Sequence, residues 1–249
     1  MRRMKLVTIS ILCSVLLLSC NAHSKNVKSL GDNSSEQASC YYPEWVANAP
    51  YAPTFEMLDT ESSLGPYAEQ TKTITLKDLI KMHGHLCDGL VTASCGLKLG
   101  LDRLYPDGVI DRTDTCCITN NSPCFGDAAA YLTGGRIRFG TQKIDPNLGN
   151  EIIIYRISTN QAVKVTLKKG VFPSELEELE KKIKSGDFTI EEMRLCQKLG
   201  WEFAESLINK PFRQSFSVET LYDFVWKSDN YIHQGTRGDV RNKDVLKKL

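Results

Sequence analysis

The chain has 249 residues, of which 41% are hydrophobic and 24% charged. This composition can bury a globular core, and it excludes collagen-like, coiled-coil and largely disordered proteins. The 31 basic and 30 acidic residues give a formal charge of +1. Because a nucleic-acid surface needs a basic excess gathered on one face, we expect no nucleic-acid partner.

The first 19 residues have the layout of an export signal. Arg2, Arg3 and Lys5 precede an apolar run over residues 6–18, which is too short to span the about 30 Å of hydrocarbon in a bilayer. The run ends Leu17-Leu18-Ser19-Cys20 and resembles the bacterial lipobox, in which the Cys is lipidated and becomes the first mature residue. We therefore expect removal of residues 1–19 and a lipid anchor on Cys20. The protein is then expected in the bacterial cell envelope, on either the inner or the outer membrane.

The rest of the chain is expected to divide into three parts. Residues 20–70 form a polar tether followed by a loop-like segment that contains Pro43, Pro50, Pro53 and Pro66. Residues 71–227 form the folded domain. Residues 228–249 are a polar tail.

Two helices are predicted at the start of the domain. Thr75 and Asp78 fit a capping box, and Gly84 ends the first helix, which carries His83 on its inward face. The second helix begins near Asp88. Its apolar residues recur every three or four positions and predict a central, buried helix: Leu86, Leu90, Ala93, Leu97, Leu101 and Leu104.

The remaining elements mix strands and helices. A strand is expected over residues 109–115, a helix from Ser122-Pro123 to Gly134, and a strand over 136–139. A hairpin follows over 151–158 and 162–168, and then two helices with capping boxes at Ser174/Glu177 and Thr189/Glu192. The Glu-Lys run over 175–184 is typical of a solvated helix face. These elements predict an α+β fold with a central buried helix, an antiparallel sheet and added C-terminal helices.

Nine cysteines constrain the chemistry of an exported protein. Seven cysteines remain when Cys13 and Cys20 are set aside. Because seven is odd, they cannot all form disulfides within one chain, and a disulfide between two copies in a homodimer is one alternative. Cys95 and Cys196 lie on helix stripes and are expected to be buried thiols. Vicinal Cys116 and Cys117 could form a disulfide or a soft-metal pair, and Cys40 could pair with Cys196 or Cys117. None of the nine forms a C-x-x-C motif.

The residues best suited to metal binding or catalysis, two His and one Cys, lie in the run His83-Gly84-His85-Leu86-Cys87-Asp88-Gly89. Cys87 and Cys124 are each expected at a helix N-terminus, where free N–H groups and the positive dipole end favour a thiolate. Two such thiols and a His predict a metal site, with zinc as the first choice because His nitrogen and Cys sulfur suit it. Cys116 or Cys117 could add a further ligand.

This run resembles the core domain of the FmdE family, which takes its name from the enzyme complex formylmethanofuran dehydrogenase. That family has an H-G-H-x-C-P-G motif, then C-G-x-D-A and L-T-G, which here correspond to Cys124-Phe125-Gly126-Asp127-Ala128 and Leu132-Thr133-Gly134. The resemblance is close over residues 76–140 and loose to residue 169, and it implies an FmdE-like α+β domain associated with a metal. The chain departs from the family with Asp88 in place of Pro, with Gly135 where many members have Cys, and in lacking a C-terminal Cys-rich zinc module. The resemblance implies a fold and a site but no substrate.

Three functions are consistent with these residues. The first is a metal-dependent protein, either enzyme or carrier, in which His85, Cys87, Cys124 and Cys117 hold zinc or another divalent transition metal such as iron. His83 and Asp127 would then act as acid, base or orienting groups. The second is a thiol redox protein in which Cys87 attacks and Cys124 resolves. The third is a lipoprotein scaffold that has kept the fold without the activity.

Overall fold

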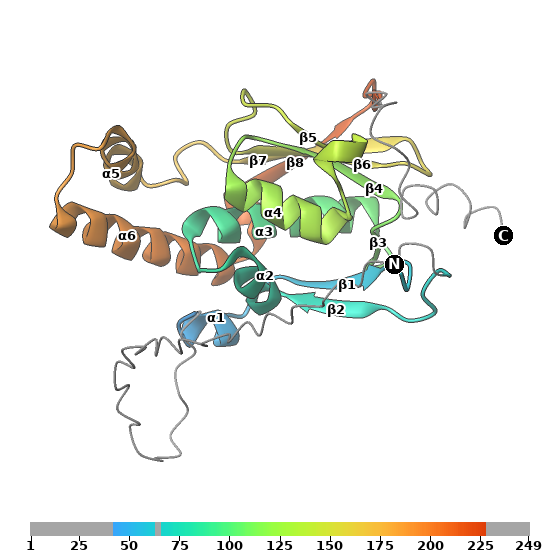
Figure 1. Ribbon diagram of the computed structural model, residues 1–249, viewed down its shortest axis with the longest axis horizontal. Coiled ribbons are helices and arrows are strands. Elements are labelled where there is room, and N and C mark those ends of the chain that lie inside the picture. Colours follow the sequence, from blue (N-terminus) through green and yellow to red (C-terminus); the bar gives the residue numbers. More distant parts are fainter. Residues whose placement is uncertain (1–41, 63–65, 228–249) are drawn as a thin grey trace, which may run out of the picture. The chain divides into compact units, whose positions relative to one another are not determined.

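Helix α3 (Asp88–Leu104) is the centre of the protein in the computed structural model, which describes residues 42–62 and 66–227 (Figure 1). Twelve of its 17 residues are buried, so the helix is enclosed rather than packed on one face. It contacts α4 (Pro123–Thr133), α6 (Ile190–Ile208) and three strands of the larger sheet. The predicted α+β fold with a central buried helix is confirmed.

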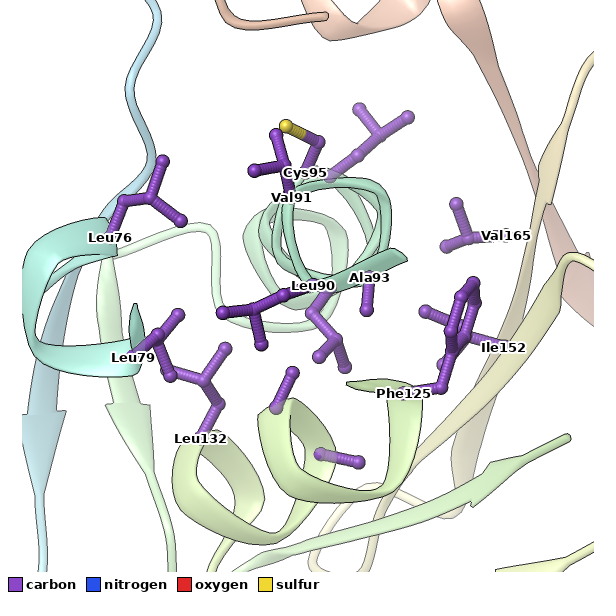
Figure 2. Close-up of a cluster of buried hydrophobic side chains, with 14 of the residues drawn as sticks. Leu76, Leu79, Leu90, Val91, Ala93, Cys95, Phe125, Leu132, Ile152 and Val165 are labelled. Atoms are coloured by element: carbon purple, nitrogen blue, oxygen red, sulfur yellow. The ribbon is translucent and has the colours of Figure 1, made fainter. Parts of the chain in front are cut away.

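The core is built around α3. Figure 2 shows Leu90 facing Leu79 of helix α2 (Leu76–His83) and Leu132 of α4, with Ile152 and Val165 of the sheet on another side of α3. These side chains are at most 2% exposed, and each contributes about 1.5–3 kcal/mol by leaving water.

The strands form two sheets. The larger has the order β5-β4-β6-β7-β8, and the smaller has the order β2-β1-β3. The strands of the larger sheet are β4 (Thr115–Thr119), β5 (Gln142–Ile144), β6 (Glu151–Arg156), β7 (Gln161–Leu167) and β8 (Phe216–Leu221). Those of the smaller sheet are β1 (Thr54–Leu58), β2 (Lys72–Thr75) and β3 (Val109–Asp111). The expected antiparallel sheet is therefore one of two mixed sheets, because β4 and β5 are parallel, as are β1 and β3.

Several predicted elements are confirmed. Helix α2 has the capping box, with Asp78 Oδ2 accepting from the backbone N–H of Thr75 at 2.9 Å, and it ends at Gly84 in the left-handed region with φ of 98°. Helix α4 begins with Pro123 after Ser122, and α6 has the Thr189/Glu192 box. Helix α5 (Ser174–Ser185) also starts where predicted, but Pro173 occupies its N-cap and the Ser174/Glu177 box does not form. The hairpin is β6 and β7.

Residues expected to be loop-like contain regular structure. Within 42–62 lie α1 (Trp45–Asn48) and β1, and β1 alternates so that Phe55 and Met57 point into the core. The prolines in this segment made regular structure hard to predict. Strand β1 pairs with both β2 and β3, so it is stabilised by pairing with other strands and not by a long local pattern. Near the C-terminal end, α7 (Phe212–Ser215) and β8 were not anticipated.

Two predicted strands are wrong in detail. The strand expected over 109–115 is split between the two sheets, since the Asp111 carboxylate accepts from the backbone N–H and hydroxyl of Thr113 at 2.8 and 2.6 Å and forms a turn. The segment 136–139 is a 3-10 turn (Ile137–Phe139), and the strand follows it as β5. A local hydrogen-bonded turn overrides strand propensity in both places.

The cysteines lie in different environments. Cys95 is buried as predicted, but Cys196 is only half-buried. Cys117 packs into the main core, while Cys116 packs with Tyr155 and Ala162 in a second cluster, because neighbouring side chains on a strand point to opposite faces. The signal segment, Cys20, Cys40 and the tail over 228–249 lie outside the described residues. Within residues 42–62 and 66–227, no helix is long and apolar enough to cross a membrane.

Candidate metal centre

The candidate site lies where α2 ends and α3 and α4 begin. Cys87 is the N-cap residue of α3, in extended conformation, and its sulfur accepts from the backbone N–H of Leu90 at 3.4 Å. Cys124 follows Pro123 in the first turn of α4. Both thiols therefore lie at helix N-termini, as predicted, where the backbone stabilises negative charge.

The donor atoms of this group lie close together. The sulfurs of Cys87 and Cys124 lie 3.3 Å apart, and Nε2 of His83 lies 3.7 Å from the Cys87 sulfur. One donor atom each from His83, His85 and Cys87 lies within 4.8 Å of the others. Gly89 allows α3 and α4 to approach closely, because a Cβ at this position would lie 3.1 Å from the Cys124 sulfur, tighter than most such contacts.

Asp127 orients His83. Its Oδ2 lies 2.8 Å from Nδ1 of His83, whose side chain is 5% exposed against 46% for Asp127. With Nδ1–H donating to this carboxylate, Nε2 presents its lone pair on the side of Cys87. The geometry therefore makes Asp127 a positioning partner for His83.

The two thiols differ in acidity. The hydrogen bond from Cys87 lowers the pKa of the Cys124 thiol to about 6, with smaller contributions from Ser122 and His83, while burial opposes the shift. The hydrogen bond to Cys124, and then burial, raises the pKa of Cys87. Over a wide pH range the pair therefore holds one proton and one negative charge, a state that a cation would stabilise.

The donor set fits a transition metal. Two sulfurs bound to one zinc ion at about 2.3 Å each lie at most about 4.6 Å apart, and the observed 3.3 Å lies within that limit. With the Cys124 sulfur, which lies 3.3 Å from that of Cys87, the donors of His83, His85 and Cys87 would make an N2S2 set. Such a set is typical of zinc and differs from the oxygen ligands that magnesium and calcium prefer. His85 is exposed, and its ring centre lies 4.6 Å from that of His83.

Cys117 is not brought into this group. It is fully buried in the core, and its sulfur lies 3.9 Å from the carbonyl oxygen of Ile118. Burial raises the pKa of its thiol, which opposes the thiolate that a metal requires. The neighbouring thiol of Cys116 faces the second cluster on the other side of β4.

The two departures from the family motif have structural consequences. A Cβ on Gly135 would lie 3.0 Å from Gln142 Cβ, 3.0 Å from Thr133 Oγ1 and 3.1 Å from the Thr141 carbonyl oxygen, so a cysteine here would require these neighbours to shift by a few tenths of an ångström. Asp88 instead brings a half-buried carboxyl to the α3 N-terminus. Burial, and then the charge of Glu180, raises the pKa of this carboxyl to about 6.

A cavity beside the sulfurs was not anticipated. It has a volume of about 560 Å³, and its wall includes Cys87, Cys124 and, from α5, Glu177, Glu180 and Lys184. These α5 residues were expected on a solvated helix face, and the side chains of Glu177 and Lys184 are 54% and 74% exposed, while that of Glu180 is 28% exposed. The solvated face of α5 thus also borders the cavity, which only the packing of α5 reveals.

A known protein family matches the region that holds the sequence motif. The family model described as "FmdE, Molybdenum formylmethanofuran dehydrogenase operon" matches residues 82–217, which include His83 through Asp127. A solved structure of a tungsten formylmethanofuran dehydrogenase FmdE-like protein from Syntrophus aciditrophicus is 16% identical, with a TM-score of 0.38 over 65% of this chain and 77% of that one. No curated protein matches the chain.

Proposed function

The chain belongs to the FmdE family, and we propose that it binds a divalent transition metal ion, with zinc preferred over iron. The ligands would be His83, His85, Cys87 and Cys124. The observation that carries the proposal is the meeting of two helix-terminal sulfurs, 3.3 Å apart, with an imidazole that a carboxylate orients. This assignment replaces Cys117 by His83 in the predicted ligand set.

Each residue would have a distinct task. Cys124 supplies the charge, since its pKa of about 6 keeps it ionised near neutral pH, and Cys87 loses its proton when the ion binds. Asp127 holds His83 in the tautomer that leaves Nε2 unprotonated. When bound, the ion would supply Lewis-acid chemistry to a water or ligand in an exchangeable position. His85, being exposed, is the donor most readily exchanged.

Metal analysis of the purified wild-type protein tests this function. We expect about one equivalent of zinc or iron per chain by mass spectrometry of metal content. The reason is that the donors of His83, His85 and Cys87 lie within 4.8 Å of one another and the Cys124 sulfur lies 3.3 Å from that of Cys87, so they would form one site. A protein that carries no metal as purified, and takes up none from a zinc solution under reducing conditions, would contradict the proposal.

Thiol redox chemistry is the second candidate, favoured by the same distance of 3.3 Å between the sulfurs. Two thiols would give up two protons and two electrons to a disulfide-containing oxidant and form one S–S bond. The lowered pKa of Cys124 reverses the predicted roles, because Cys124 would attack and Cys87 would resolve. Absence of metal together with a mass loss of two hydrogens on oxidation would favour this function.

We further propose that the site works in the cell envelope on a lipid anchor at Cys20. The support is the sequence of residues 1–20, with its basic start, short apolar run and lipobox. Cys20→Ala should release the protein from the membrane fraction, whereas Cys13→Ala in the apolar run should not. If Cys20→Ala stays in the membrane fraction with unchanged electrophoretic mobility, the anchor is elsewhere or absent.

A further inference from the structure

Two of the proposed ligands lie on one short segment without regular secondary structure. His85 and Cys87 fall between the end of α2 and the start of α3, on either side of Leu86, whose side chain is 6% exposed and packs into the core. The peptide bond between Leu86 and Cys87 is planar, so the direction of the Leu86 carbonyl fixes the plane from which the backbone of Cys87 continues. A group that holds this carbonyl therefore helps to set where the Cys87 sulfur lies.

The carbonyl of Leu86 is held by a residue 115 positions away. Trp201 of α6 donates from Nε1 to this oxygen at 3.3 Å, and no other donor to it occurs within residues 42–62 and 66–227. The preceding residue of α6 lies beside the other end of the segment, since a Cβ on Gly200 would lie 3.3 Å from Oδ1 of Asp88. Helix α6 thus contacts the ligand-bearing run both before and after Cys87.

Trp201 reaches the segment from outside the imidazole–thiol group. That group comprises the four proposed ligands, His83, His85, Cys87 and Cys124. The indole of Trp201 is half-buried and lines a surface groove of about 380 Å³ together with Trp45 of α1, whereas the wall of the cavity beside the sulfurs does not include it. Any influence of Trp201 on a bound ion would therefore pass through the backbone of Leu86.

We infer that Trp201 is a positioning residue for the candidate metal centre: its indole N–H, by holding the Leu86 carbonyl, keeps His85 and Cys87 in the arrangement that binds the ion. Partners that hold a metal ligand directly contribute about 10–100-fold to affinity. Trp201 acts through one peptide unit, so its loss should weaken zinc binding by about tenfold, the lower end of that range. The inference rests on the proposed function for this effect on affinity only, because the hydrogen bond orders the segment with or without an ion.

The test replaces two indoles that donate to backbone carbonyls. Trp201→Phe removes the hydrogen bond to Leu86. Trp226→Phe is the matched control, because Trp226 Nε1 donates to the carbonyl of Gly140 at 3.1 Å, outside the imidazole–thiol group. Competition of the full chain with a chromophoric chelator for zinc, in reducing buffer, should give about tenfold weaker binding for Trp201→Phe and unchanged binding for Trp226→Phe.

Hydrogen exchange in the metal-free chain gives a readout that needs no ion. The amides of Leu90 and Val91 donate to the sulfur and the carbonyl of Cys87 at 3.4 and 3.3 Å, so they report on the position of Cys87. They should exchange severalfold faster in Trp201→Phe, as expected from loss of one hydrogen bond, while amides at the centre of α3 keep the wild-type rate. If Trp201→Phe does not fold, 3-benzothienylalanine at position 201 keeps the shape of the indole and lacks its N–H.

The outcomes separate the two proposals. Equal zinc affinity in the wild type and Trp201→Phe, an equal loss in Trp226→Phe, or unchanged exchange at Leu90 overturns the positioning role while leaving the metal content as measured. A wild-type protein that binds no zinc overturns the proposed metal function, and the exchange at Leu90 then decides the positioning role by itself.

Discussion

Replacing Cys87 with Ser is expected to remove bound metal almost completely. A hydroxyl stays protonated near neutral pH and is a poor ligand for zinc, so a soft thiolate is lost at the centre of the group. Changes to groups that merely orient ligands weaken metal binding by about 10–100-fold, and loss of a direct ligand should exceed about 100-fold. Metal content after dialysis, and competition with a chromophoric chelator, measure the effect.

Cys196→Ser is the matched control for that experiment. Cys196 lies half-buried on α6, outside the imidazole–thiol group. The same sulfur-to-oxygen change should therefore leave metal content intact and lower the free energy of unfolding by about 1 kcal/mol or less. If Cys87→Ser kept its metal while Cys196→Ser lost it, the site would not lie in the His83 to Gly89 run.

Gly100→Ala is expected to destabilise the fold by about 1–2 kcal/mol. A Cβ at this position of α3 would lie 2.5 Å from Ile154 Cδ1 and 2.8 Å from Val165 Cγ2, so the helix would be pushed from the sheet. Such overpacking costs about 1–3 kcal/mol, offset in part by the higher helix propensity of Ala, worth up to about 1 kcal/mol. Equilibrium unfolding in denaturant measures the difference.

Gly96→Ala is the comparison, one turn earlier on the same helix. Its Cβ would lie 3.4 Å from Ile152 Cδ1, an ordinary contact. The gain in helix propensity should then prevail, leaving stability unchanged or raised by up to about 1 kcal/mol. Equal unfolding midpoints for the two variants would contradict this prediction, because they would show that α3 can shift away from the sheet with no loss in the free energy of unfolding.

Capping and terminating residues in the sequence determine where the helices of the site begin and end. The Thr75/Asp78 box and the left-handed Gly84 bound α2, and Pro123 after Ser122 begins α4. Such signals act within one turn of the chain, so they can be recognised in the sequence without knowledge of the fold. They are the reason that Cys87 and Cys124 were correctly expected at helix N-termini.

Contacts between distant residues were decided only by the tertiary structure. Asp127 orients His83 across 44 positions of sequence, and Cys117 faces the core because of the pleat and register of β4. Helix α5 packs so that its Glu and Lys side chains line the same cavity as Asp88, which its ordinary Glu-Lys sequence does not reveal. The sequence by itself determined which residues could act and where their helices begin. Which of them meet depends on packing, because side chains far apart in the chain are brought together by burial of the whole core and by no local pattern.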